Sequence, residues 1–444
     1  MLKRIWGERM IVNVIGAGLA GSEVAYNLGK RGIRVRLFEM RPKKMTEVHK
    51  TGYFAELVCS NSLKSEDITN AEGLLKAEMK LMGSITLEAA EKARVPSGKA
   101  LAVDRNIFAK EVTEAIESLE SVEVIREEVT EFDPEEGLWV VATGPATSDG
   151  LFSFLRNLLG DDFLFFFDAV SPIVTFESID MEHAFWGDRF GKGKDYINCP
   201  LTDGEYEELW KALVEAEVIE MEDFDRKLLF ERCQPIEEIA RSGKDALRYG
   251  PLRPTGLVDP RTGKEPYAVV QLRREDKEGR FYSLVGFQTR LKWNEQKRVL
   301  RKIPCLRNAE IVRYGVMHRN VYINSPKLLD IFFRLKKQPN IFFAGQITGV
   351  EGYMESAASG IYVAYNVYRI LKGLSPLKLP EETMMGALFS YIIEKVEGDL
   401  KPMYANFGLL PPLKTRVKDK FGKRKKLAER AIEAMRKFLE EYPW

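Results

Sequence analysis

Histidine and cysteine are scarce in this sequence, which has 3 histidines and 4 cysteines in 444 residues. Cys59, Cys199, Cys233 and Cys305 form no CxxC pair and no zinc-ligand spacing, and no two histidines are spaced as metal ligands. A metal site and a dense disulfide framework are therefore not expected, and each thiol can be judged alone. Few, scattered cysteines are typical of a reducing compartment, so we expect a cytoplasmic protein.

The sequence also lacks a long apolar run and an excess of charge of either sign. No window approaches the roughly 18 apolar residues that a membrane span requires, so no membrane partner is expected. Lys and Arg number 67 and Asp and Glu 66, and the formal net charge is +1. Such a balance attracts neither nucleic acid nor a membrane, so RNA would have to bind a local basic patch. With 45% apolar and 30% charged residues, the composition is typical of a globular protein of about two to three domains.

A glycine-rich segment occupies residues 11–39, IVNVIGAGLAGSEVAYNLGKRGIRVRLFE. It predicts a buried strand, a tight turn, a helix and a second strand. Gly16, Gly18 and Gly21 have GxGxxG spacing, in which the first glycine makes the turn, the second admits a pyrophosphate and the third lets helix and strand pack closely. Glu39 ends the second strand, at the position where a carboxylate accepts hydrogen bonds from ribose hydroxyls. The predicted dinucleotide contacts of this unit are Gly16, Ala17, Gly18, Gly21 and Glu39.

Two later segments indicate which dinucleotide is bound. Both GLWVVATGPATS, residues 137–148, and PNIFFAGQITGVEGYMESAASG, residues 339–360, predict a strand that runs into a glycine turn. They resemble the second and third fingerprints of FAD proteins with two dinucleotide folds, whereas a nicotinamide dehydrogenase would need only the first fingerprint. FAD is therefore the predicted cofactor. The predicted contacts from these segments are Gly144, Gly345, Gln346, Gly349, Gly352 and Tyr353.

Because these segments lie far apart, the FAD domain must be discontinuous. We predict an α/β protein, with a Rossmann-like FAD-binding domain of the two-dinucleotide-fold type and an inserted mixed α/β domain. In the insertion, residues 196–201 predict a strand, after which Thr202 and Glu205 predict a capping box that opens a helix. Residues 267–275 and 280–288 predict a hairpin. The predicted ranges are 1–9 for a disordered extension, 10–165 and 310–444 for the FAD domain with C-terminal helices, and 166–309 for the inserted substrate and tRNA domain.

Motifs spread over nearly the whole chain resemble one family. They are VIGAGLAGSEVA, ELVCSNSLKSE, ALAVDR, ATGPATS, FERCQPIEEIARSGKDALRYGPLRPTGL, GFQTRLKWNEQKRVLRKIP, FFAGQITGVEGYMESAASG and ANFGLLPPL. The family is that of the folate- and FAD-dependent tRNA (uracil-5-)-methyltransferases, TrmFO. One departure is Tyr404, where the family pattern has Asn, and it leaves open any polar role of that side chain.

The resemblance implies methylation of C5 of the T-loop uridine, position 54 of tRNA. It implies 5,10-methylenetetrahydrofolate as the carbon donor, reduced FAD as the reductant and NAD(P)H as the electron source. NAD(P)H would bind transiently, because the chain has no second complete GxGxxG. The target base is stacked in folded tRNA and must be extruded, at a cost on the order of a few kcal/mol. The oligomeric state is unknown from the sequence.

The reaction needs a reactive thiol, because C5 of uracil is a poor nucleophile until a thiolate adds at C6. The resemblance implies that Cys59 and Cys233 are the catalytic cysteines. Cys233 is flanked by Glu231 and Arg232, and a nearby arginine lowers the pKa of a thiol. Cys59 is implied to lie by the flavin and to handle the one-carbon unit or a thiol relay. Which cysteine attacks C6 stays open.

RNA contacts would have to come from local basic patches. The main one is the stretch 414–426, which has basic residues on several helical faces with Phe421 interleaved, although a charge run usually marks a solvated face. Trp293 is a candidate for stacking on the pterin or the base, and the resemblance places His318 at the active-site wall. Core packing explains both residues equally well. Smaller patches are Arg273 with Arg274, and Arg298 with Arg301 and Lys302. The predicted substrate contacts are Arg290, Trp293, His318, Lys423 and Arg424.

The other cysteines and histidines have structural explanations. Cys199 lies in a predicted strand and Cys305 in an apolar turn, and neither falls in a family motif, so both are predicted to be structural. His49 and His183 lie in charged stretches that are typical of a surface.

Other functions remain open. The wobble-uridine modifying enzymes of the GidA/MnmG family share FAD and folate use, but they are longer chains with an extended helical C-terminal region. A plain FAD-dependent oxidoreductase would be favoured by a CxxC pair and a second GxGxxG, and neither is present. A non-enzymatic FAD-binding RNA protein would keep its function without Cys233.

Overall fold

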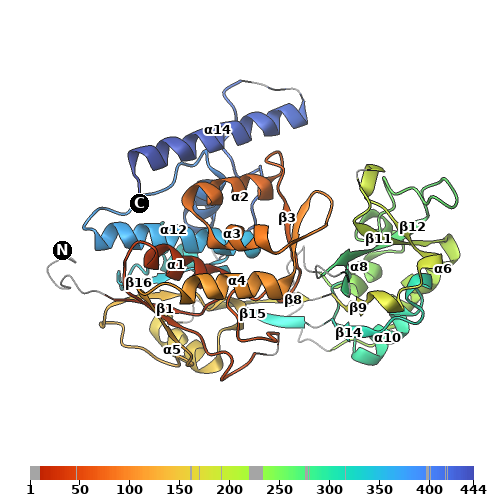
Figure 1. Cartoon of the computed structure of the whole chain (residues 1–444), viewed down its shortest axis with the longest axis horizontal. Helices are drawn as coiled ribbons and strands as arrows, with labels where there is room; N and C mark the ends of the chain where they lie inside the picture. Colours follow the sequence, from red (N-terminus) through yellow and green to blue (C-terminus); the bar gives the residue numbers. More distant parts are fainter. Residues whose placement is uncertain are drawn as a thin grey trace.

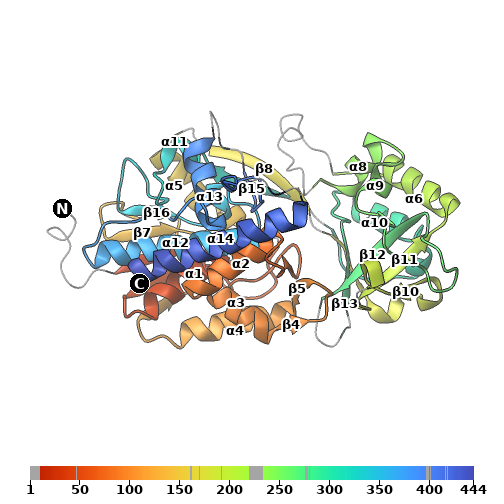
Figure 2. The same ribbon diagram turned by 90° about the horizontal axis from the view of Figure 1, so that it is seen from above.

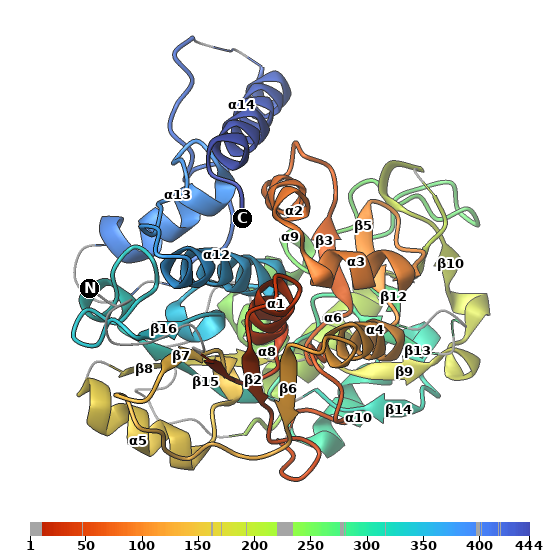
Figure 3. The same ribbon diagram turned by 60° about the vertical axis from the view of Figure 1, so that its left-hand side comes forward.

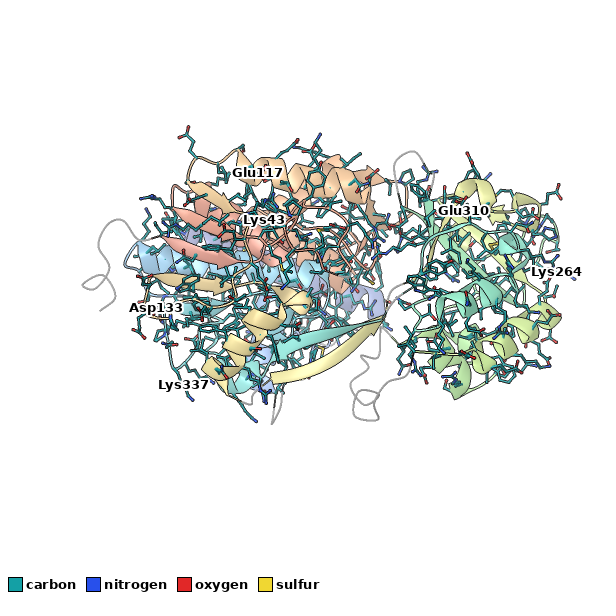
Figure 4. All side chains as sticks on the ribbon, turned by 90° about the horizontal axis from the view of Figure 1, so that it is seen from below. Lys43, Glu117, Asp133, Lys264, Glu310 and Lys337 are labelled. Carbon is teal, nitrogen blue, oxygen red and sulfur yellow. A yellow bond between two sulfur atoms is a disulfide. The ribbon has the colours of Figure 1, made fainter. Side chains whose placement is uncertain are left out.

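The computed structural model shows two bodies joined by the chain. Figure 1 shows a larger body that contains the C-terminus and a smaller body formed by the middle of the chain, drawn in yellow to green. Among the labelled side chains, Lys43 and Glu117 lie on the larger body, and Lys264 and Glu310 on the smaller one (Figure 4). The described residues are 11–46, 48–160, 163–169, 171–191, 193–219, 234–275, 279, 281–315, 317–396, 400, 402–415, 417 and 419–444, with only the backbone described at 163–169 and 317–320.

A parallel sheet of five strands, in the order β16-β7-β1-β2-β6, forms the centre of the larger body. The strands are β1 (Val12–Ile15), β2 (Val35–Phe38), β6 (Val122–Ile125), β7 (Leu138–Val141) and β16 (Ile341–Phe343). β1, β7 and β16 are buried along their whole length, as is usual for a sheet covered on both faces. β16 comes from a distant part of the chain and pairs with β7. The predicted α/β fold with a discontinuous Rossmann-like domain is confirmed.

Two helices pack closely against each other and against this sheet. They are α1 (Leu19–Gly29) and α12 (Tyr353–Leu371). A Cβ atom on Gly21 would lie 1.8 Å from the carbonyl oxygen of Gly16. A Cβ atom on Gly360 would lie 2.3 Å from the carbonyl oxygen of Ala20. Only glycine therefore permits this approach of backbone to backbone.

The rest of the larger body consists of helices and a small antiparallel sheet in the order β3-β5-β4. The C-terminal helix α14 packs along α2 on the outside of the body (Figure 3). None of the helices within the described residues is long and apolar enough to cross a membrane. The elements are β3 (Ser62–Ser65), β4 (Arg94–Val95), β5 (Ala100–Val103), α2 (Ala71–Met82), α3 (Ile85–Lys92), α4 (Arg105–Glu117), α5 (Asp149–Leu159), α11 (Ser325–Leu328), α13 (Met384–Ser390) and α14 (Lys420–Glu441).

An antiparallel sheet of six strands, in the order β10-β11-β12-β13-β9-β14, forms the smaller body. Helices pack on it and enclose a second hydrophobic core, separate from that of the larger body. The elements are β9 (Ile173–Thr175), β10 (Phe185–Trp186), β11 (Tyr196–Leu201), β12 (Ala268–Arg274), β13 (Phe281–Leu284), β14 (Ile311–Arg313), α6 (Asp203–Glu215), α8 (Ile236–Ser242), α9 (Ala246–Tyr249) and α10 (Trp293–Leu300).

Several local predictions for this body are confirmed. β11 covers the predicted residues 196–201, and Thr202 and Glu205 form the predicted capping box at the start of α6. The predicted hairpin strands pair as β12 and β13. The sheet extends to Arg313 through β14, so the predicted end of the insertion at residue 309 is too early.

Two paired strands connect the bodies. β8 (Phe163–Ala169) and β15 (Met317–Ile323) run antiparallel to each other. The chain leaves the larger body along β8 and returns to it along β15 (Figure 2). The smaller body is thus an insertion held at both of its ends.

A disulfide joins Cys199 in β11 to Cys305 in the turn Pro304–Leu306. Both residues are fully buried in the core of the smaller body. The prediction that these cysteines are structural is confirmed, but the expectation that each thiol stands alone was wrong. The two positions are 106 residues apart in sequence, and the fold brings their Cα atoms to 5.9 Å.

Gly21→Ala is expected to disrupt the packing of α1, because the added Cβ would overlap the carbonyl oxygen of Gly16. Gly18→Ala is the matched control, since a Cβ on Gly18 meets no atom within 4 Å. We expect the free energy of unfolding to fall by about 1–3 kcal/mol or more in Gly21→Ala alone. Urea denaturation followed by circular dichroism measures both variants, and equal losses would contradict the packing argument.

The disulfide is expected to stabilise the smaller body, because it closes a loop of 106 residues in the unfolded chain. The double variant Cys199→Ala/Cys305→Ala is expected to lose about 2–4 kcal/mol of unfolding free energy. Chemical denaturation of the wild-type protein with and without dithiothreitol provides the comparison. Dithiothreitol should lower the stability of the wild type and leave the double variant unchanged; a wild type indifferent to reductant would show that the bond does not form.

Candidate functional site

A cleft opens at the carboxyl ends of the parallel strands. Its lining comes from the segments that follow β1, β2, β7 and β16. This edge is where open α/β sheets bind their ligands. The predicted contacts that line it are Gly16, Gly18, Glu39, Gly144, Gly345, Gln346 and Tyr353. The predicted contacts that do not line it are Ala17, Gly21, Gly349 and Gly352.

The first glycine turn leaves room for a ligand where α1 begins. Gly16 has a φ of +95°, in the region that favours glycine, and a Cβ there would lie 2.8 Å from the carbonyl oxygen of Ala142. A Cβ on Gly18 or Gly144 would meet no atom within 4 Å. The first N–H groups of a helix have no intrahelical partner, and the helix dipole favours an anion there. These residues therefore fit the pyrophosphate of a dinucleotide.

Glu39 is buried at the end of β2 and is held in place by Arg41. The Arg41 side chain donates to both carboxylate oxygens, over 2.9 and 3.0 Å, and the N–H of Ala17 donates over 3.1 Å. Burial alone would raise the pKa of Glu39, but the hydrogen bonds and charge of Arg41 hold that pKa below its usual value. The charged carboxylate is thus fixed beside the cleft, where it suits ribose hydroxyls. Arg41 was not predicted from the sequence, where its one signal is its position two residues after Glu39.

His49 lines the cleft, so its predicted place on the surface was wrong. Its Nδ1 lies 2.6 Å from Oγ1 of Thr46. Burial and the nearby charge of Arg41 lower the pKa of His49 to about 4, which leaves the ring neutral near pH 7. His183 is exposed, as predicted, beside Asp180. No cluster of three or more potential metal-binding side chains occurs in the described part of the chain.

Tyr353 joins the cleft to the loop that carries Cys59. It is the first residue of α12, and it lines the cleft. Its hydroxyl accepts hydrogen bonds from the N–H groups of Cys59, over 2.6 Å, and Ser60, over 3.1 Å. Val58, which precedes the cysteine, also lines the cleft. The structure therefore brings the half-buried Cys59 beside the predicted cofactor contacts, although 294 residues separate it from Tyr353.

Two guanidinium groups interact electrostatically with Cys59, those of Arg105 and Arg313. Burial lowers the pKa of Arg313, as does the charge of Arg105, while Tyr353 and Cys59 oppose this shift. Positive charges near a cysteine favour its thiolate form. Neither arginine was predicted as a neighbour of Cys59, because neither lies near it in the sequence.

Cys233, the other predicted nucleophile, lies outside the described residues. Arg290 is described and is 2% exposed. Its guanidinium donates to the carbonyl of Ile219, over 3.1 Å, and pairs with Glu238. The prediction that Arg290 contacts the substrate conflicts with this burial, because its charge is already bound within the protein.

Trp293 is accessible and belongs to an aromatic pair. It is 63% exposed and stacks on Tyr314, with ring centroids 5.2 Å apart. Lys297 lies 5.9 Å from the Tyr314 ring centroid. His318 lies in β15, and its side chain is outside the described set. Tyr404, the departure from the family pattern, has Lys64 Nζ 6.0 Å from its ring centroid.

Most of the smaller basic patches are engaged within the protein. Arg273 donates to Ser60 and Asn61, Arg298 pairs with Glu295, and Lys302 pairs with Glu208. Arg298 and Lys302 nevertheless stay accessible, with side chains 41% and 40% exposed, so their contact with RNA stays a prediction. Near the start of α14 the situation differs. Lys423 is exposed, and the Arg424 guanidinium lies 5.6 Å from the ring centroid of Phe407.

The sheet, glycine turn and cleft define a dinucleotide-binding protein with the fold of GidA. The sequence profile described as "Glucose inhibited division protein A" matches residues 11–375. The solved structure of Aquifex aeolicus GidA superposes with a TM-score of 0.69. The match covers 97% of this chain and 73% of that chain at 17% identity, so it supports the fold alone.

Relatives with higher sequence identity define the family more closely. Methylenetetrahydrofolate--tRNA-(uracil-5-)-methyltransferase TrmFO of Thermotoga sp. (strain RQ2) is 95% identical over 98% of this chain and 100% of its own length. The enzyme of that name from Thermosipho melanesiensis is 60% identical over 97% of this chain and 99% of its own length. The one from Aquifex aeolicus is 56% identical over 97% of this chain and 96% of its own length. This chain belongs to the TrmFO family of enzymes, as its motifs predicted.

Tyr353→Phe is expected to loosen the Cys59 loop, because two N–H groups lose their common acceptor. Tyr362→Phe is the matched control in the same helix, since that hydroxyl bonds to the carbonyls of Ile331 and Leu377 instead. Alkylation of Cys59 by iodoacetamide, located by peptide mass spectrometry, is expected to be about fivefold faster in Tyr353→Phe. Similar alkylation rates in the two variants would contradict the assigned role of the hydroxyl.

Proposed function

We propose that this chain transfers a one-carbon unit from 5,10-methylenetetrahydrofolate to C5 of the T-loop uridine at position 54 of tRNA, and completes it as a methyl group. The observation that carries the proposal is the meeting of Cys59 with the dinucleotide cleft through the hydroxyl of Tyr353. A thiol beside a redox cofactor is what this reaction requires. The relatives' shared name, which specifies a folate donor and a tRNA uracil, supports the same conclusion.

FAD is the dinucleotide that we propose for the cleft. Gly16 and Gly18 would hold its pyrophosphate at the start of α1, and Glu39 would hold a ribose. When bound and reduced, FAD supplies the hydride that turns the transferred carbon into a methyl group. Tyr353 borders both the cleft and the Cys59 loop, so the reacting atoms would meet beside it. NAD(P)H is the proposed electron donor and would bind transiently.

Cys59 and Cys233 are the proposed catalytic thiols. A thiolate adds to C6 of uracil and makes C5 nucleophilic, so that C5 attacks the methylene carbon of the folate. A base then removes the C5 proton, and the bond between the transferred carbon and the folate nitrogen breaks, which leaves a methylene group on C5. Hydride addition to this methylene carbon makes the methyl group, and the thiolate leaves C6. Arg105 and Arg313 support the ionised form of Cys59, and Arg232 would do the same for its neighbour Cys233.

Two accessible groups of side chains are proposed to contact the tRNA. Lys423 and Arg424 lie at the basic start of α14, where phosphates would bind. The exposed ring of Trp293, stacked on the half-buried Tyr314, offers an aromatic face to an unstacked base. A cytoplasmic location follows from the proposed tRNA substrate. The disulfide is compatible with it, since intracellular proteins of some heat-adapted organisms contain such bonds.

Wild-type protein with FAD, NAD(P)H and labelled methylenetetrahydrofolate is expected to form labelled 5-methyluridine in an unmodified tRNA transcript. A transcript with cytidine in place of the T-loop uridine should stay unlabelled. Cys59→Ala is expected to lower the labelling rate by at least about a thousandfold and to keep the flavin absorbance. The variant Cys199→Ala/Cys305→Ala is the matched control, with a rate within about twofold of the wild type at moderate temperature.

Other results would point to other functions. Label in the anticodon wobble uridine would favour the activity of the GidA/MnmG family. Flavin turnover with a small molecule and no labelled RNA would favour a plain oxidoreductase. Unchanged labelling by Cys233→Ala would exclude Cys233 as a catalytic residue, and loss of the flavin from Cys59→Ala would indicate a structural role for Cys59.

A further inference from the structure

The loop 57–61 is bound by the larger body at two places. The hydroxyl of Tyr353 accepts hydrogen bonds from the N–H groups of Cys59 and Ser60. The guanidinium of Arg105, the first residue of α4, donates to three successive carbonyls of the loop. The distances are 3.0 Å to Leu57, 3.5 Å to Val58 and 3.4 Å to Cys59. Both sides of the backbone around the thiol are thereby occupied.

The inserted domain binds the same loop from a third side, at the end of β12. Arg273 donates to Oγ of Ser60, over 2.6 Å, and to Oδ1 of Asn61, over 2.8 Å. The Asn61 amide donates to the carbonyl of Arg274, over 2.6 Å. The next residue, Glu275, is 5% exposed. In Figures 1 and 2 the small sheet that contains β3 and β5 lies on the side of the larger body that faces the insertion.

A buried ion pair links these two sets of contacts. Nε of Arg105 lies 2.7 Å from Oε2 of Glu275, and the two side chains are 13% and 5% exposed. Asp104 caps α4 by accepting from the N–H groups of Asn106 and Ile107, so the start of this helix is rigid. A carboxylate of the inserted domain therefore neutralises the arginine that holds the carbonyls of the Cys59 loop.

We propose that Arg105 and Glu275 are positioning residues for Cys59, through which docking of the inserted domain sets the place of the thiol beside the cleft. The inference rests on the proposed function, because it assigns these residues a part in methyl transfer. Glu275 orients the Arg105 guanidinium, and the guanidinium orients the backbone of Cys59. A displacement of about 1 Å in such an arrangement costs on the order of a hundredfold in rate.

Glu275→Gln tests the proposal, because it removes the charge that orients Arg105 and keeps the size of the side chain. The kcat for methyl transfer is expected to fall at least about tenfold, with KM for tRNA within about twofold of the wild type and the flavin retained. The alkylation rate of Cys59 by iodoacetamide is expected to rise about three- to tenfold, because the loop is looser and Arg105 is no longer neutralised. If Glu275 acted only by activating the thiol, its replacement would change kcat and the alkylation rate of Cys59 in the same direction.

Arg105→Lys is the second variant. It keeps the positive charge but loses the hydrogen bonds to the three successive carbonyls. Its kcat should fall and its rate of Cys59 alkylation should rise, which tests the proposal even if Glu275→Gln fails to fold. Tyr196→Phe is the matched control, since it removes a hydrogen bond between the same two bodies, to Ser97 over 3.1 Å, away from the Cys59 loop. It should change neither rate by more than about twofold.

Equal losses of kcat in Glu275→Gln and Tyr196→Phe would overturn the proposal, as would unchanged alkylation of Cys59 in both Glu275→Gln and Arg105→Lys. If the wild-type protein labels no tRNA, the proposed function fails instead. The alkylation rates still decide in that case whether the ion pair positions the thiol.

Discussion

The close approach of α1 and α12 is the constraint on which the site depends. Gly21 and Gly360 leave no space for a side chain, so both helices begin at the same edge of the parallel sheet. The start of α12 carries Tyr353 to the cleft, and its hydroxyl binds the backbone of Cys59. A contact between backbones thus determines where a thiol lies, although the thiol belongs to a distant part of the sequence. The inserted domain completes the arrangement from the other side of the loop.

Buried charges in this site are neutralised because an isolated ion loses its hydration in the protein interior. Glu39 is bound by Arg41, and Arg105 by a carboxylate of the inserted domain. His49 lies beside the positive Arg41 and is neutral, since its pKa is about 4. Near neutral pH the cleft therefore contains a charged Glu39 and a neutral His49. The pair of Arg105 and Glu275 also connects the two bodies, whose hydrophobic cores are separate.

Features that depend on residues close in sequence were predicted correctly, and features that depend on contacts between distant segments were not. The glycine turns, the strand at 196–201 and the capping box of Thr202 were predicted because each depends on residues that are close in sequence. The disulfide, the burial of Arg290 and the place of His49 in the cleft were missed. Each of these depends on which surfaces meet after folding, and no spacing along the chain carries that information.

The sequence by itself determined the class of the protein, its family and its dinucleotide cleft, because glycine spacing and motif chemistry are properties of short segments. Only the tertiary structure decided what surrounds Cys59. The thiol takes its place from Tyr353, Arg105 and Glu275, which come from three separate elements. Hydrogen bonds and ion pairs act over a few ångströms, so their partners are known only when the fold has brought these elements together.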